Sequence, residues 1–231
     1  MKSITHIKIN VSGLNSILFV FLVLFSLFSA AGQLFPKGIY MNTNEIKQKK
    51  PSNNAFLKLE KRTLGEIKMS GGNDYRLTSL DKSISRKEIK KNILAYSSGD
   101  TLYINCFKYK AQQWYSPVLN NGRVLLFLGG ISQDENLFNY QIQETETSMF
   151  WSKLGGAIGS GIQAAKLAQL RFPYLLDTTN NKIIYLNDFG LEELLSEHNL
   201  ELLKLYREEK SQNRDSINEL ILKYVYKLNN L

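Results

Sequence analysis

Residues 114–128 read WYSPVLNNGRVLLFL, and this stretch decides the fold. An apolar run at residues 114–119 is followed by a turn of Asn120, Asn121 and Gly122 and by a second apolar run at residues 124–128. That order is the local signal of an antiparallel hairpin. Because every residue from 124 to 128 is apolar, we expect this strand to be buried on both faces, in the interior of a sheet.

Three more stretches repeat this pattern of two apolar runs around a short turn of Gly, Asn, Asp or Ser. They pair residues 65–69 with 75–79, 93–97 with 101–109, and 174–176 with 182–186. Apolar residues alternate with polar ones along residues 102–109, so we expect that strand to turn one face to solvent. Together the four stretches predict an antiparallel sheet.

Helical signals gather at the carboxyl end. Asp188 and Asn199 are suitable N-caps, and apolar residues recur behind them at helical spacing. The three apolar stripes are Leu191, Leu194 and Leu195; Leu202, Leu203 and Tyr206; and Ile217, Leu220, Ile221, Tyr224, Val225 and Leu228. Hairpins followed by helices predict an α+β domain whose antiparallel sheet is covered on one side.

The stretch at residues 154–165 carries no charge and consists largely of Gly, Ala and Ser. It is too short to span a bilayer, which takes about 20 apolar residues. We therefore expect a helix over about residues 149–171, packed on the sheet. Small residues four apart also suit an oligomer or membrane contact, and a disordered loop is the third alternative.

The amino terminus has the three parts of an export signal in order. Lys2 and Lys8 give a positive start, residues 17–28 are apolar except for Ser26, and small residues follow at 29–32. We expect residues 1–32 to be removed, leaving a single domain at 33–231, exported to the periplasm or secreted, with no transmembrane helix. The cut would lower the net charge from +8 to +6.

Few residues suit metal or nucleophilic chemistry. His198 would be the single histidine after cleavage, and Cys106 is the single cysteine. We interpret His198 as an exposed residue at a helix end, and Cys106 as a small buried hydrophobe rather than a reactive thiol. No spacing of ligands indicates a metal site, and no cofactor is expected.

Two short motifs resemble known cofactor-binding signatures. Residues 159–164 match the dinucleotide fingerprint G-x-G-x-x-A, but no strand precedes them in a βαβ unit. Asp188, Phe189 and Gly190 spell the kinase metal-binding triplet without the other kinase motifs. We interpret this triplet as an N-cap and the first turn of a helix.

A glycosidase needs only two carboxyl groups held at a defined separation. Glu144 and Glu146 lie two apart, so on a strand they would share one face. Polar residues on a solvated strand or loop explain the pair equally well.

The positive charge is concentrated in one segment. Thirteen basic and six acidic residues lie between Glu45 and Lys91, a local charge of +7, whereas residues 92–231 sum to −2. Export argues against nucleic acid as a partner. The segment could bind an anionic envelope polymer or an acidic protein, or it could be a solvated face without a partner.

Several short motifs, taken in order, resemble an uncharacterised family of exported proteins from Bacteroidota. They are the residues at 35–40 (FPKGIY), 50–52 (KPS), 71–75 (GGNDY) and 100–105 (DTLYIN), followed by the small-residue segment that runs into 166–171. The resemblance covers nearly all of residues 35–231. It implies export and transfers no catalytic residue.

Two functions follow as hypotheses. The first is a non-enzymatic binding or interaction protein of the cell envelope, which the basic segment favours. The second is a carboxylate-dependent hydrolase of envelope glycans, which would use Glu144 and Glu146.

Overall fold

The computed structural model describes residues 35–54, 57–147, 165, 167–212 and 217–231. All of them belong to the compact unit Leu34–Leu231. They form nine strands and seven α-helices, and all the strand pairs are antiparallel. The predicted α+β class with an antiparallel sheet is confirmed.

The elements have the following bounds. The strands are β1 (Gly38–Tyr40), β2 (Leu57–Lys61), β3 (Tyr75–Ser79), β4 (Ala95–Ser97), β5 (Leu102–Asn105), β6 (Tyr115–Asn120), β7 (Val124–Gly129), β8 (Phe172–Asp177) and β9 (Lys182–Tyr185). The helices are α2 (Thr43–Gln48), α3 (Leu64–Ser70), α4 (Arg86–Lys91), α5 (Glu135–Thr147), α8 (Asp188–His198), α9 (Leu200–Gln212) and α10 (Ile217–Asn229), with a 3₁₀ turn η1 (Cys106–Tyr109).

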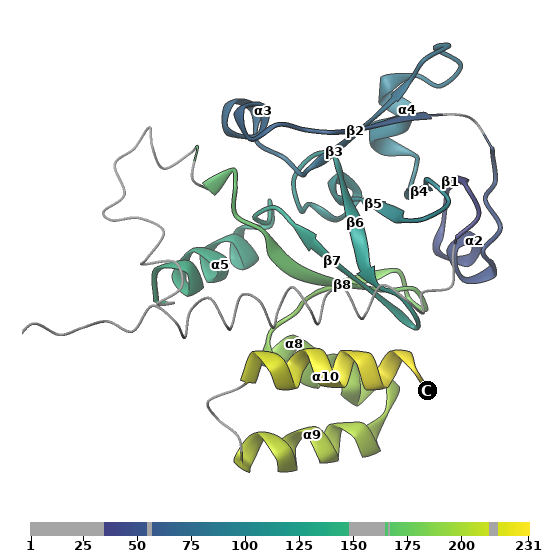
Figure 1. The fold of residues 1–231 in the computed structure, drawn as a ribbon. Helices are drawn as coiled ribbons and strands as arrows, with labels where there is room; N and C mark the ends of the chain where they lie inside the picture. Colours follow the sequence, from purple (N-terminus) through teal and green to yellow (C-terminus); the bar gives the residue numbers. More distant parts are fainter. Residues whose placement is uncertain (1–34, 55–56, 148–164, 166, 213–216) are drawn as a thin grey trace, which may run out of the picture. The chain divides into compact units, whose positions relative to one another are not determined.

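Strand β6 organises the sheet, whose order is β1-β4-β5-β6-β7-β8-β9 (Figure 1). Its first residue, Tyr115, is paired with Asn105 of β5 and with Tyr75 of β3. Its second half pairs with β7, where the register shifts between Val118 and Asn120. Strand β3 in turn pairs with β2. Three of the four predicted hairpins, β4–β5, β6–β7 and β8–β9, are confirmed.

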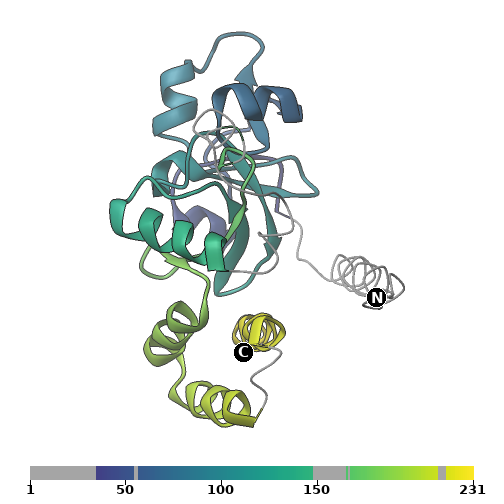
Figure 2. The same cartoon turned by 90° about the vertical axis from the view of Figure 1, so that its left-hand side faces the viewer.

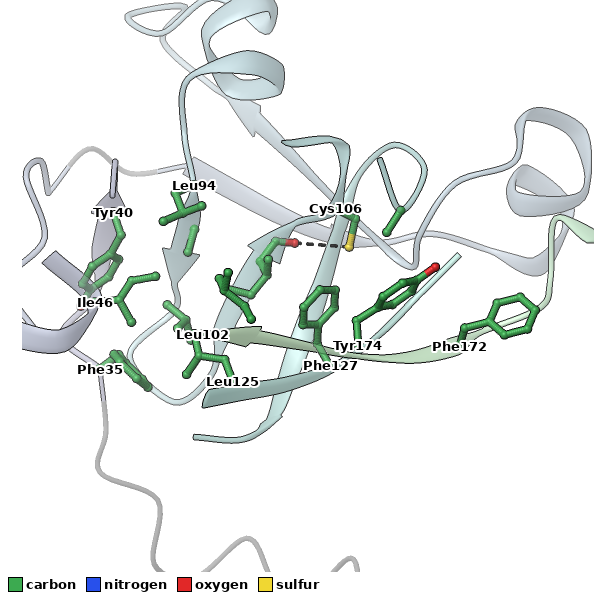
Figure 3. Packing of buried hydrophobic residues seen from close by; sticks show 14 of the residues in the cluster. Phe35, Tyr40, Ile46, Leu94, Leu102, Cys106, Leu125, Phe127, Phe172 and Tyr174 are labelled. Carbon is green, nitrogen blue, oxygen red and sulfur yellow. Dashed lines mark hydrogen bonds between the residues drawn. The ribbon is translucent and has the colours of Figure 1, made fainter. Parts of the chain in front are cut away.

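The main core lies on one face of β7 and β8. Leu125, Phe127 and Tyr174 pack there with residues of β4 and β5, and their exposed fractions are 1% or less. Figure 3 shows these side chains together with Leu94 and Leu102. Burial of this apolar face holds strands β4 and β5 against strands β7 and β8.

The opposite face of β7 and β8 is also covered. Val124, Leu126 and Leu175 alternate with the main-core residues and belong to a second core cluster, which also contains the buried residues of α8, α9 and α10. Figures 1 and 2 show these helices together next to the β7–β8 end, with α3 and α4 at the opposite end of the unit. The expected burial of residues 124–128 is confirmed up to Phe127, Leu128 being 38% exposed, but the expectation of a sheet covered on one side is wrong.

Strand β5 is buried on both faces, which contradicts the solvated face expected for residues 102–109. Leu102 and Ile104 belong to the main core, while Tyr103 packs with Ile89 of α4 and Leu77 of β3. The strand also ends earlier than expected. The Asn105 side chain accepts a hydrogen bond from the Phe107 N–H, which caps η1.

Residues 65–69 form helix α3 instead of the expected strand. Thr63 and Glu66 make a capping box, in which each side chain accepts a hydrogen bond from the other's backbone N–H. A capping box satisfies two free N–H groups and favours a helix start. The partner of residues 75–79 is therefore β2, which lies further back in the chain.

The C-terminal helices follow the predicted apolar stripes, with one change of cap. Asn187, not Asp188, is the N-cap of α8, and its side chain accepts from the Gly190 N–H at 2.7 Å. Asn199 accepts from the Leu202 N–H at the start of α9. Asp188 is the first residue of α8 and forms an ion pair with Lys210.

Two predictions fall wholly or largely outside the described residues. They are the export signal at residues 1–32 and the helix expected over about residues 149–171, including the small-residue segment 154–165. Among the helices that are described, none is long and apolar enough to cross a membrane.

Candidate functional site

Four of the thirteen basic residues of the segment lie on helix α4. Ser85 and Glu88 form a capping box that starts this helix. Ile89 is buried beneath it, whereas Arg86, Lys87 and Lys91 are exposed. Residues three or four positions apart share a helix face, so Lys87 and Lys91 point the same way.

The 3₁₀ turn η1 extends this positive surface. Lys108 donates from Nζ to the Asn92 carbonyl at 3.0 Å, and the Lys90 ammonium lies 4.4 Å from the centre of the Phe107 ring. We call Arg86, Lys87, Lys90, Lys91 and Lys108 the α4–η1 basic face.

Elsewhere many basic side chains have acidic partners. Lys58 and Arg76 contact Glu60, and Arg171 contacts Asp74 at 2.6 Å. By contrast, within the described part of the chain no ion pair includes a residue of the α4–η1 basic face.

The acidic residue of α4 is already engaged. Hydrogen bonds from the Ser85 hydroxyl and backbone N–H hold the Glu88 carboxylate and lower its pKa. Glu88 therefore serves as the capping residue of α4 and forms no ion pair with the α4–η1 basic face.

The carbonyl end of α4 is clamped from below. The Asn105 side-chain amide donates to the carbonyls of Ile89, Lys90 and Ile93, at 3.3, 2.9 and 2.7 Å. The Tyr115 hydroxyl also donates to the Ile89 carbonyl, at 2.6 Å. Buried contacts of this kind fix the position of α4. The basic side chains therefore project from a rigid helix.

Sequence reasoning missed a buried polar network beside α3. The Arg62 guanidinium donates to the carbonyls of Gly71 and Asn73, each at 2.8 Å, and to the Ser70 hydroxyl at 2.7 Å. Burial lowers the pKa of Arg62. The groups that accept these hydrogen bonds are neutral. Arg62 therefore joins the end of α3 to the loop that follows it.

Asn73 continues this network across 40 residues of sequence. Its amide donates to the carbonyls of Ala111 and Gln113, and its oxygen accepts from the Gly130 N–H at 2.7 Å. Nearby, the Gln141 amide donates to the Tyr174 hydroxyl, which donates to the Gly130 carbonyl. The Gly-Gly-Asn triplet at 71–73 looked like a turn, and nothing local revealed these distant partners.

The interpretation of His198 as an exposed helix-end residue is wrong. Its Nε2 lies 2.5 Å from Oδ2 of Asp177, whose side chain is fully buried, and the His198 side chain is 11% exposed. The other carboxylate oxygen of Asp177 accepts from the Thr179 N–H at 2.7 Å. Helix α8 ends where its last residue reaches the β8–β9 turn, so the pair connects the helix to the sheet.

Asp177 and His198 also meet a third possible metal ligand, Glu197, within 4.8 Å. Direct contacts already fill this cluster, since His198 bonds to Asp177 and the Lys182 ammonium lies 3.4 Å from Glu197. This geometry joins α8 to β8–β9 through the His198–Asp177 hydrogen bond and the Lys182–Glu197 ion pair.

We expect Asp177→Asn to destabilise the protein by about 1–3 kcal/mol at neutral pH. Burial alone raises the pKa of this carboxyl, but hydrogen bonds from Thr179 and His198 outweigh it and lower the pKa below the ordinary 3.8. The carboxylate thus contributes stability above that ordinary value, and the contribution is lost as the pH falls through the lowered pKa.

Urea unfolding at neutral pH and at the lowest pH where the wild type still folds tests this expectation. The difference between wild type and Asp177→Asn should shrink in acid. The exposed control Asp100→Asn should change stability by less than about 0.5 kcal/mol. Equal effects of the two substitutions at neutral pH would contradict the role given to Asp177.

Cys106 behaves as predicted. It is a free cysteine with no exposed surface, and its Sγ lies 3.7 Å from the Ile104 carbonyl oxygen (Figure 3). Burial raises the pKa of the thiol to about 12. Thiolate chemistry is therefore suppressed at this position.

The glutamate pair does not lie on a strand. Both Glu144 and Glu146 fall in helix α5. Positions two apart in a helix are rotated by about 200° relative to each other, so the shared face expected from a strand is lost. The strand assumed for the glutamate pair is therefore wrong, and the carboxylate-hydrolase hypothesis stays a prediction.

The two cofactor-like motifs have different outcomes. Residues 159–164 lie outside the described residues. The Asp188 triplet forms the first turn of α8, as expected, although the N-cap is Asn187. The glycine has a packing reason, since a Cβ on Gly190 would lie 2.1 Å from the Tyr185 carbonyl oxygen.

The strands and helices together define an α+β protein built on a nine-stranded antiparallel sheet. The profile of a family of unknown function, DUF6563, matches residues 38–231, and the chain belongs to this family. Comparison with curated proteins and with solved structures gives no match.

Proposed function

We propose that this protein is a non-enzymatic binding protein of the cell envelope that recognises an anionic polymer through the α4–η1 basic face. The observation that carries the proposal is the concentration of five basic side chains, none in an ion pair with a described carboxylate, on one clamped helix and the adjoining turn. A surface with one sign of charge attracts polyanions and raises their rate of association.

The buried contacts that fix α4 make the α4–η1 basic face suitable for binding a polymer with repeated negative charges. Asn105 and Tyr115 hold the helix carbonyls, and Ile89 anchors its inner face. Ordering a flexible helix would cost binding free energy, and a fixed one avoids that cost.

The envelope location rests on the export signal proposed for residues 1–32. Amino-terminal sequencing of the protein recovered from cells tests it. A mature chain that begins close to Gln33 supports export, and a chain that still begins at Met1 contradicts it.

Binding to heparin, a soluble polyanion, tests the basic face directly. Replacing Arg86, Lys87 and Lys91 together with glutamine should weaken the affinity about tenfold, since each exposed charge contributes a few tenths of a kcal/mol to about 1 kcal/mol. All three side chains are exposed, so the variant should keep the wild-type melting temperature.

A matched control removes the same charge from the same basic segment. Lys47, Lys50 and Lys68 are exposed residues that make no ion pair with a described carboxylate. Their triple replacement with glutamine should change the affinity far less. Equal loss in the two triple variants would show that net charge alone drives binding and would overturn the assignment to α4–η1.

A further inference from the structure

A pocket of about 350 Å³ is lined by residues outside the α4–η1 basic face. Gly71 and Gly72 form one wall, and Gln112 and Gln113 form a second. Ser132, Gln133 and Phe138 are also among its lining residues. The volume is at the lower end of the range for small-ligand sites, which suits a ligand of one or two sugar rings.

The backbone of the two walls is held in uncommon conformations. Gly71 and Gly72 have φ of 64° and 85°, and the non-glycine residue Gln112 has φ of 65°. Trp114, which follows the second wall, has φ of 75°. Positive φ is unfavourable for non-glycine residues and persists only where the surroundings enforce it, often at ligand sites.

Hydrogen bonds hold the backbone of the two walls in these conformations. The Gln112 side chain accepts from the Gly72 N–H at 2.8 Å, which joins the two walls. Asn73 ties the same loops to Ala111, Gln113 and Gly130. Gln141 accepts from the Ser132 N–H at 2.8 Å and fixes the third side. The pocket is therefore shaped before any ligand arrives.

The lining has the chemistry for an uncharged ligand rich in hydroxyl groups. It contains no Lys, Arg, Asp or Glu, so a charged ligand would find no counter-ion in the lining. The exposed side chains of Gln113 and Gln133 make no hydrogen bond with the described residues. An amide donates and accepts at once, as a sugar hydroxyl does.

Phe138 adds an apolar surface to this polar rim. Its side chain is partly buried and packs against the main core, and the Phe138 N–H bonds to the Asp134 carbonyl in the first turn of α5. An aromatic ring next to a few convergent polar groups is the usual composition of a small-molecule site.

We propose that this pocket binds a neutral saccharide unit, with Gln113 and Gln133 bonding its hydroxyl groups and Phe138 packing on its carbon face. The site is independent of the proposed polyanion binding, because it uses other elements and an uncharged ligand.

Ligand-observed NMR with two neutral probes, maltotriose and N,N′-diacetylchitobiose, tests the proposal on the purified protein. We expect at least one probe to bind at millimolar concentration. Gln113→Ala and Gln133→Ala should each weaken it about tenfold, the effect of losing one well-placed hydrogen bond. Because both side chains are exposed, the melting temperature should stay unchanged. Gln48→Ala, at an exposed position on α2, should bind as the wild type does.

Three outcomes would overturn the saccharide assignment. One is the absence of binding by both sugars. Another is binding that is insensitive to both glutamine substitutions, since the sugar would then occupy another surface. The third is that neither sugar binds, whereas trialanine, a peptide with uncharged side chains, binds and is weakened by the two glutamine substitutions. Heparin binding by the α4–η1 basic face would be unaffected by any of these results.

Discussion

Replacing Gly190 with alanine is expected to destabilise the protein by about 3 kcal/mol or more, because the new Cβ has no space. It would lie 2.1 Å from the Tyr185 carbonyl oxygen and 3.0 Å from Cγ2 of Ile184. The Gly190 N–H is also bonded to the N-cap side chain of Asn187. Moving the backbone apart to admit the methyl group would therefore disturb the cap that starts α8.

Gly65→Ala is the matched control for this substitution. Gly65 is an exposed residue of α3, and the nearest atom to its new Cβ would be Thr63 Oγ1 at 3.9 Å. Alanine favours a helix interior by about 1 kcal/mol over glycine, so Gly65→Ala should stabilise the protein slightly. Urea unfolding of both variants measures the contrast. A Gly190→Ala variant as stable as the wild type would show that β9 and α8 do not meet as closely as described.

The second large effect is expected at Arg62. Arg62→Met keeps most of the side-chain volume but removes the donors to Gly71, Asn73 and Ser70, and it should cost about 3 kcal/mol. Three of the lost acceptors are backbone carbonyls, those of Glu66, Gly71 and Asn73. A buried acceptor left without a donor carries most of the cost.

Arg62→Lys distinguishes the contribution of the positive charge from that of the arrangement of the guanidinium donors. Lysine keeps the positive charge but not the planar fork that reaches several acceptors, so most of the loss should remain. The exposed control Arg123→Met should change the free energy of unfolding by less than about 0.5 kcal/mol. Equal stabilities of Arg62→Met and Arg123→Met in urea unfolding would contradict the structural role of Arg62.

The parts of the fold that depend on neighbouring residues were predictable. The hairpin β6–β7 and the hairpin β8–β9 each place both strands and the turn within a short stretch of chain, so turn residues and apolar runs sufficed. The stripes of α8, α9 and α10 were equally readable because the apolar face of each helix joins the core cluster that covers β7 and β8.

A local signal in the sequence favours the helix found at residues 65–69 over the expected strand. Thr63 and Glu66 have the capping-box spacing, which favours a helix start over a strand. Strand β5 carries no such signal. Its second face is covered by α4 and β3, and that cover depends on how distant elements pack.

The polar groups of the site were the hardest to foresee. Asn73 bonds to residues about 40 positions away, and His198 meets Asp177 across 21 positions. A buried polar side chain takes its partner from the tertiary structure, so spacing along the chain carries no information about it. The basic segment could be identified from its charge alone. Only the structure shows that four of its basic residues lie on α4, next to Lys108 of η1.

Co-sedimentation with isolated cell envelopes is the most direct measurement of the central claim, binding of an anionic envelope polymer by the α4–η1 basic face. We expect the wild type to sediment with envelopes at low salt and to be released as salt screens the charges. The glutamine variant of Arg86, Lys87 and Lys91 should stay in the supernatant, while the variant of Lys47, Lys50 and Lys68 sediments as the wild type does. Retention of the first variant at the wild-type level, or absence of wild-type binding, would contradict the claim.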